Sequence, residues 1–157
     1  MNVVYANPKD FNGNRIIELG NDNKGFTNRS VLLADDDYVN YLYYQEILED
    51  MGIRTYRAIS LGQLLFKMKM IRNIDLILIS SSFSAQFEYK LNRYLRDRYP
   101  HIPQISILNE ETDMEIRSKL ADGSDTLLTS QIDGYQLLDA VHDLFNTPTN
   151  VRIAQSY

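Results

Sequence analysis

Short apolar runs alternate with amphipathic segments five times between residues 31 and 145, and this alternation constrains the fold more than any other feature. Strands that alternate with helices form a parallel sheet with right-handed crossovers and helices on both faces. We therefore expect an α/β fold, a doubly wound sheet of five strands in the order 2-1-3-4-5. The predicted strands are 31–34, 54–58, 74–79, 103–108 and 124–128. The predicted helices are 38–51, 61–71, 85–98, 111–121 and 133–145.

The first apolar run ends in three consecutive carboxylates, Asp35, Asp36 and Asp37. Because burying an unpaired carboxylate is costly, we expect all three to lie outside the core. The carboxyl end of the strand is the place for them, since open α/β sheets hold their sites there. Asp37 is predicted to cap the following helix, and Ser60, with Gln63 three residues on, can cap the next one. A cap needs only one side chain, so Asp35 and Asp36 indicate a site.

The chain divides by composition into three parts. Residues 30–146 contain the alternating pattern, and a chain of 157 residues is long enough for one domain with a full core. Residues 1–29 are rich in Asn and Gly turn signals and form either a small hairpin or a loosely attached arm. Residues 147–157 are a C-terminal tail without a clear pattern.

Composition excludes several classes of function. The chain has no cysteine, which excludes disulfides, thiolate chemistry and cysteine zinc sites. A net charge of −5 argues against nucleic acid as a direct ligand. No apolar run reaches membrane-spanning length, and the first twelve residues lack the pattern of a signal peptide. We therefore expect a cytoplasmic protein with no membrane partner.

From Val31 to Phe145 the sequence resembles a receiver domain of two-component signalling. The resemblance is carried by the acid pair after the first strand, by the run from Asp75 to Ser80, and by residues 124–132 with the helix that follows. It implies the flavodoxin-like (βα)5 fold. It also implies a site of five parts: a magnesium-binding acid pair, a phosphoacceptor aspartate, a hydroxyl residue, a lysine and a proline.

Only the acid pair of that site is kept. Asp35 and Asp36 match the acids that bind magnesium, whereas the phosphoacceptor position is Ser80. The other three positions hold residues of the wrong chemistry: Leu108 (or Asn109, if the register slips by one) for the hydroxyl, Ser130 for the lysine and Gln131 for the proline. Ser130 can also be explained as the cap of the last helix, with Asp133 completing a Ser-x-x-Asp box, and both explanations can hold together.

These departures predict a degenerate receiver, or pseudo-receiver. A serine cannot form an acyl phosphate, and magnesium should bind weakly at Asp35 and Asp36 because the third carboxylate is missing. No cofactor is required, and the Ser130–Gln131 peptide bond is expected to be trans. One alternative is a receiver that keeps weak binding of a divalent metal or a phosphoryl ligand at the acid pair. A second is a serine-dependent hydrolase, but no base is evident beside Ser80, so we predict that the chain is not an enzyme.

An apolar patch on the first helix suggests how such a domain works. Val39 and Leu42 face away from the predicted core, and Tyr41 lies at the margin. In the family this region meets the histidine-bearing partner, so the resemblance implies a sensor histidine kinase or a phosphotransfer domain as partner. Scattered surface apolar residues are the alternative explanation. The segment 111–145 resembles the family's output and dimer face, which makes a homodimer possible. The sequence predicts a phosphorylation-independent protein-interaction module.

Overall fold

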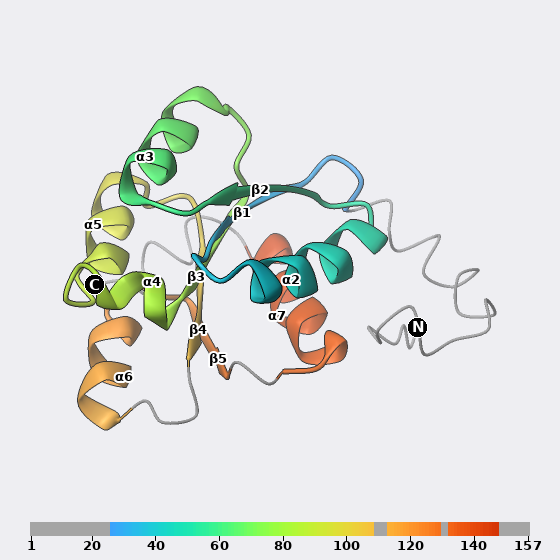
Figure 1. Cartoon of the computed structure of the whole chain (residues 1–157). Helices are drawn as coiled ribbons and strands as arrows, with labels where there is room; N and C mark the ends of the chain where they lie inside the picture. The colour runs from blue at the N-terminus through green and yellow to red at the C-terminus, as the bar shows by residue number, and fades with distance from the viewer. Residues whose placement is uncertain (1–25, 109–112, 130–131, 148–157) are drawn as a thin grey trace.

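The computed structural model describes residues 26–108, 113–129 and 132–147, and its centre is a parallel five-stranded sheet (Figure 1). The strand order is β2-β1-β3-β4-β5, which confirms the predicted fold class. The strands are β1 (Ser30–Ala34), β2 (Arg54–Ala58), β3 (Leu76–Ser80), β4 (Gln104–Leu108) and β5 (Thr126–Thr129). All five residues of β1, β3 and β4 are buried, as expected for strands covered on both faces.

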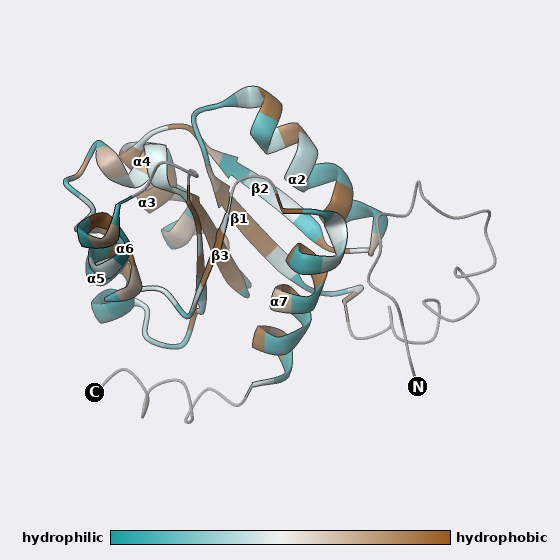
Figure 2. Ribbon diagram, turned by 90° about the horizontal axis from the view of Figure 1, so that it is seen from below, coloured by the Kyte–Doolittle hydropathy of each residue, from teal (hydrophilic) through white to brown (hydrophobic). Residues whose placement is uncertain are grey.

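Two layers of helices cover the sheet (Figure 1). The helices are α2 (Tyr38–Asp50), α3 (Leu61–Met70), α4 (Ser81–Ala85), α5 (Leu91–Arg98), α6 (Met114–Ala121) and α7 (Gly134–Asn146). Successive side chains of a strand point to opposite faces, so Val31 and Leu33 contact the core under α2 and α7, whereas Leu32 lies in the core under α3 and α5. Figure 2 shows the hydrophobic strands enclosed between these layers.

Two of the predicted helix starts are confirmed by their caps. Asp37 caps α2, because its Oδ1 accepts hydrogen bonds from the backbone N–H groups of Val39 (2.9 Å) and Asn40 (3.2 Å). Ser60 caps α3 by accepting from the Gln63 N–H at 3.2 Å, and the Gln63 side chain accepts in return from the N–H of Ile59. Such reciprocal bonds satisfy the exposed N–H groups at a helix start.

The cap predicted for the last helix is wrong. Asp133, not Ser130, is the N-cap of α7, and its carboxylate accepts from the N–H of Gln136 at 2.9 Å. Asp133 lies immediately before the first helical residue, and a carboxylate there also interacts favourably with the helix dipole. Ser130 and Gln131 lie outside the described residues, as does the peptide bond between them. The prediction of a trans bond therefore stays a prediction.

The single helix predicted over residues 85–98 is also wrong, because the structure has two helices there. α4 begins directly after β3 and ends at Ala85, and α5 begins only at Leu91. Between them Glu88 and Tyr89 have φ values of 55° and 60°, a left-handed backbone that ends a helix. Neither residue is glycine, so the break has no local signal in the sequence.

The predicted arm and the C-terminal tail flank the domain, and only the end of each that adjoins the domain is among the described residues. Residues 1–25 and 148–157, which hold most of the predicted arm and tail, lie outside the described residues. Phe26, at the end of the arm, is buried, and its ring lies 5.8 Å from the rings of His142 and Phe145 on α7. Within the described ranges, no helix has both the length and the apolar composition needed to cross a membrane.

Candidate functional site

The carboxyl ends of the strands bring together most of the residues that the sequence singled out. Ala34 pairs with Ile79, so Asp35 and Ser80, which follow them, lie side by side at the same edge of the sheet. Ser80 pairs with Ile107, and Leu108 therefore ends β4 next to it. Leu108 is buried and pairs with Thr129 at the end of β5. Asn109 and Ser130 lie outside the described residues.

Asp35 lies inside the protein, which corrects the expectation that all three acids avoid the core. Its exposed fraction is 0%. The Asp35 N–H donates to the carbonyl of Ala58 at 3.2 Å, which extends the pairing of β1 with β2 by one residue and holds Asp35 in the sheet. One carboxylate oxygen accepts from the Asp37 N–H at 2.9 Å, and the other has no hydrogen-bond partner among the described residues.

This burial changes the acidity of Asp35. The pKa of its carboxyl rises from 3.8 to about 6, mainly because burial disfavours the charged form. The hydrogen bond from the Asp37 N–H and, to a smaller extent, the nearby hydroxyl of Ser80 lower the pKa, and the charges of Asp36 and Asp37 raise it. The buried phenol of Tyr44 is affected in the same way: burial, followed by the charge of Asp35, raises its pKa. A cation at this position would favour the ionised carboxylate.

Asp36 is exposed and connects the end of β1 to α4. Its Oδ1 accepts from the Ser82 hydroxyl at 3.4 Å, and its Oδ2 accepts from the Gln86 side-chain amide at 3.2 Å. Asp36 is thus held by neutral donors from the segment that follows β3. Ser82 and Gln86 were not predicted to take part, and their only signal in the sequence is their position just after a strand that ends at the site.

Ser80 has a structural role that accounts for its hydroxyl. Its Oγ accepts from the N–H of Phe83 at 3.2 Å, so Ser80 is the N-cap of α4, and it lies 3.1 Å from the Oγ of Ser82. Neither histidine stands beside it. His101 borders a cavity with Asp75 at the opposite edge of the sheet, and His142 lies on α7 against Phe26. A nucleophilic serine needs an adjacent base, and the described residues offer none to Ser80 except carboxylates.

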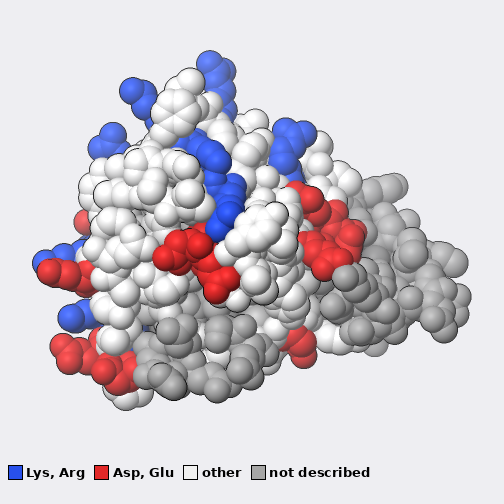
Figure 3. All heavy atoms as spheres, viewed as in Figure 1, with Lys and Arg blue, Asp and Glu red and all other residues white. Residues whose placement is uncertain are grey.

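A positively charged side chain, that of Arg57, also lies next to the acids, and it was not predicted from the sequence. The guanidinium of Arg57, on β2, lies 5.2 Å from the ring centre of Tyr38 and 4.8 Å from that of Tyr41. Its Nε donates to the backbone carbonyl of Asp35 at 3.3 Å, and the side chain of Lys67 donates to the carbonyl of Arg57. The alternation of side chains along a strand could have placed Arg57 on the sheet face opposite α3, because Thr55 and Arg57 alternate with residues that face α3. Figure 3 shows an acidic patch at the centre of this face with a band of Lys and Arg beside it.

The metal site implied by the sequence is present only in part. Among the described residues, no group of three or more histidines or carboxylates is close enough to hold a metal ion. Asp35 offers one oxygen without a partner, and Asp36 offers two that Ser82 and Gln86 already occupy. Magnesium prefers an octahedron of hard oxygens, so two carboxylates and the Ser80 hydroxyl fit a weak site.

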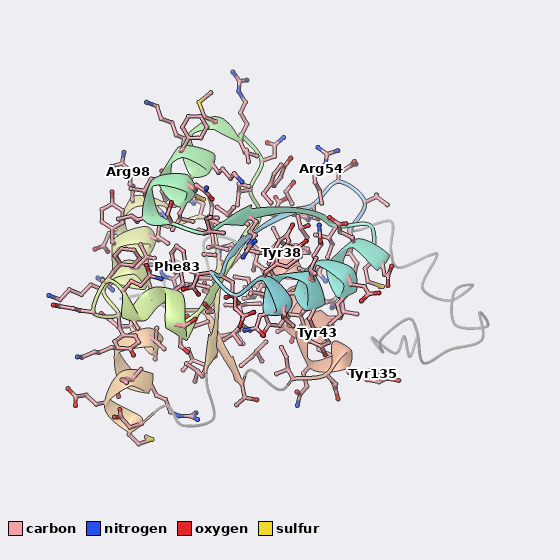
Figure 4. The ribbon with its side chains drawn as sticks, viewed as in Figure 1. Tyr38, Tyr43, Arg54, Phe83, Arg98 and Tyr135 are labelled. Carbon is pink, nitrogen blue, oxygen red and sulfur yellow. The ribbon has the colours of Figure 1, made fainter. Side chains whose placement is uncertain are left out.

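The apolar patch on α2 is exposed as expected. Val39 is 74% exposed and Leu42 is 41% exposed, whereas Tyr41 is half-buried against the core. Tyr38 and Tyr43 extend the patch, and the hydroxyl of Tyr43 donates to the carbonyl of Ile132 at 2.9 Å. Figure 4 shows both tyrosines on α2, with Tyr38 at its first turn.

Comparison with solved structures finds the same fold in receiver domains. A response regulator from Thermotoga maritima shares 17% identity at a TM-score of 0.68, with 76% of this chain and 98% of that chain covered. A two-component response regulator from Clostridium difficile shares 19% at a TM-score of 0.67, covering 76% and 99%. A receiver domain of a histidine kinase from Clostridium thermocellum shares 15% at 0.66, again covering 76% and 99%. No protein-family model matches the sequence, and no curated protein matches it significantly. At these identities the likeness shows the fold and leaves the chemistry to the residues themselves.

Proposed function

We propose that this chain is a degenerate receiver domain that works in two-component signalling as a protein-interaction module independent of aspartyl phosphorylation. The observation that carries the proposal is Ser80. It occupies the end of the central strand β3, next to the two acids, and its hydroxyl caps α4 instead of meeting a base or a cation. A serine in this position cannot form the acyl phosphate that a carboxylate forms.

The surroundings of Ser80 support the same conclusion. Leu108 presents a buried apolar side chain at the end of β4, where a hydroxyl would be needed to contact a phosphoryl group. Asp36, which would help to hold a cation, is instead bound by the neutral side chains of Ser82 and Gln86. Through Asp36, Ser82 and Gln86, the contacts at this edge connect β1 to α4.

The patch on α2 is the proposed docking surface. Tyr38, Val39 and Leu42 are exposed beside the acidic patch, and exposed apolar side chains that cluster near charged groups are typical of interaction sites. The partner we propose is a sensor histidine kinase or a phosphotransfer domain, bound through apolar contacts at the patch. Pairing of two copies through the segment 111–145 is a further proposal, and sedimentation of the full chain tests it.

A second candidate function rests on the oxygen of Asp35 that has no hydrogen-bond partner among the described residues. A buried carboxylate with a raised pKa and an unsatisfied oxygen is a position that a divalent cation or a phosphoryl ligand with its cation could stabilise. This candidate keeps the receiver fold but adds ligand control to the interaction. Calorimetric titration with magnesium, alone and with phosphate, separates it from the first proposal.

Incubation with acetyl phosphate and magnesium, followed by intact mass measurement, tests phosphorylation directly. We expect no mass gain, while a receiver domain with an aspartate at the acceptor position gains one phosphoryl group under the same conditions. A gain that disappears in Ser80→Ala would refute the proposal. A gain that remains in Ser80→Ala but disappears in Asp36→Asn would place acceptance on the acid pair instead.

The docking surface needs a matched control. Val39→Glu/Leu42→Glu is expected to abolish binding to histidine kinase and phosphotransfer domains that the wild type binds. Phe66→Glu/Met70→Glu changes two equally exposed apolar residues of α3 (62% and 61%) and should leave that binding unchanged. Equal loss in both variants would show that the α2 patch is not the specific surface.

A further inference from the structure

A cavity of about 370 Å³ lies at the opposite edge of the sheet from the acids, where β1 and β2 begin and α3 ends. It is bordered by the turn before β1, by the first residues of β2, and by the residues after α3. Arg54 and Tyr56 both point to the α3 side of the sheet, because they are two residues apart on β2. Figure 4 shows Arg54 at this edge, beside the loop that leads into β1.

The charge of the cavity is the reverse of that of the chain. Three arginines, Arg29, Arg54 and Arg72, border it, and no Asp or Glu among the described residues does, although the chain carries a net charge of −5. Arg29 is held by Asp75 at 3.7 Å and by the ring of Phe145 at 5.1 Å from its guanidinium. Arg54 and Arg72 make no ion pair with any described residue. Like charges grouped without a counter-charge favour an anion between them.

Neutral donors complete the lining. The hydroxyl of Ser30 and the side-chain amides of Asn28 and Asn73 border the same cavity. Guanidinium groups bind phosphate oxygens in a bidentate way, and hydroxyl and amide groups add further hydrogen bonds. The cavity is in the size range of small-molecule sites, and Tyr56 and Ile71 supply limited apolar surface.

We propose that this cavity binds a small molecule with two or more phosphate groups, such as a nucleoside diphosphate. Arg54 and Arg72, which make no ion pair within the described part of the chain, match a ligand with more than one phosphate better than a single anion. The aromatic ring of Tyr56 offers a contact for the organic part of the ligand. The cavity lies at the opposite edge of the sheet from Asp35, so this proposal does not depend on the proposed receiver function.

Isothermal titration calorimetry of the full chain, in metal-free buffer with a chelator, tests the proposal with pyrophosphate, ADP and citrate. We expect pyrophosphate and ADP to bind, with affinity that falls as salt rises, and citrate to bind at least about tenfold more weakly. Tighter binding of ADP than of pyrophosphate would assign the organic contact to Tyr56. Equal binding would show that the phosphates alone are recognised, and both results support the site.

Two charge-matched variants localise the binding. Arg54→Gln/Arg72→Gln removes two exposed cations from the cavity and should weaken both phosphate ligands by about tenfold or more. Lys90→Gln/Arg98→Gln removes two cations at and before α5 and should change the affinity by no more than about twofold. Asp36→Asn, at the acidic edge, should keep full binding. Far-ultraviolet circular dichroism confirms that each variant is folded.

Several results would overturn the proposal. They are no binding of either phosphate ligand at about 10 mM, equal affinity for citrate, or equal loss in the two charge-matched variants. Binding of a single-stranded oligonucleotide or an acidic peptide without binding of pyrophosphate would also overturn it, because the partner would then be a macromolecule.

Discussion

The buried carboxylate of Asp35 makes the stability of this protein depend on pH in an unusual direction. Its pKa is about 6 in the folded protein and close to 3.8 when the chain is unfolded. Between these two values the folded state holds more protons than the unfolded state, so the free energy of unfolding falls as pH rises. Protonated Asp35 therefore contributes to the free energy of unfolding. This contribution is fully present below about pH 4 and is lost as the pH rises through about 6.

The substitution Asp35→Asn removes this dependence. The shift in pKa corresponds to about 3 kcal/mol at about 1.36 kcal/mol per pH unit, an upper value because the folded protein can relax. The asparagine oxygen can still accept from the Asp37 N–H, but its amide hydrogens meet no known acceptor, which costs about 1–3 kcal/mol at every pH. The clear prediction is therefore a change with pH: relative to the wild type, the variant gains up to about 2.5 kcal/mol between pH 4 and pH 7.5.

Urea denaturation at half-unit steps of pH, in chelator, measures this change. Thermal unfolding should show the same change as a shift in melting temperature of up to about 5–10 °C for a chain of this length. Asp50→Asn, at the exposed end of α2, is the control and should follow the wild-type curve. Parallel curves for the wild type and Asp35→Asn would refute the reasoning, because they would show that the buried carboxylate is not penalised.

Three further measurements test other parts of the account. Calorimetric titration with magnesium at pH 7 should give a dissociation constant no tighter than about 1 mM, and binding should weaken at pH 5, where Asp35 is protonated. Gly123→Ala should destabilise the fold by about 2 kcal/mol in urea denaturation, because an added Cβ would overlap the backbone of Asn92. Gly62→Ala, where the nearest atom is 3.9 Å away, should instead stabilise α3 by about 0.5–1 kcal/mol in the same assay.

The parts of the fold that depend on local chemistry were predictable. The strands could be placed because short strand-like runs alternate with amphipathic segments, and the predicted 54–58 matches β2 residue for residue although it contains two arginines. Asp37 and Ser60 could be assigned as caps because a cap acts within three residues of its own position. The alternation predicts the parallel sheet, since parallel strands need crossover helices, and the order 2-1-3-4-5 was predicted as the doubly wound order that fits five strands.

The errors come from contacts between segments far apart in the chain. The break between α4 and α5 allows Asn92 to lie fully buried, where its side chain donates to Ser106 at 2.8 Å and accepts from Ser84 at 2.9 Å. No local pattern announces that network. The burial of Asp35 was missed for a similar reason, because it depends on the bond from its N–H to Ala58 on a neighbouring strand. Strand periodicity can assign Arg57 to one face of β2, but its place beside the acids follows from the pairing of β2 with β1.

One measurement tests the central claim, that the domain does not switch by phosphorylation. Magnesium with beryllium fluoride, which mimics a phosphoryl group on a carboxylate, is added to isotope-labelled protein while amide resonances are followed by NMR. Because Ser80 replaces the acceptor carboxylate, we predict unchanged resonances for Ser80, Leu108 and Thr129, at the ends of β3, β4 and β5. Saturable shifts of all three would show that the site still accepts the phosphoryl mimic and would contradict the account.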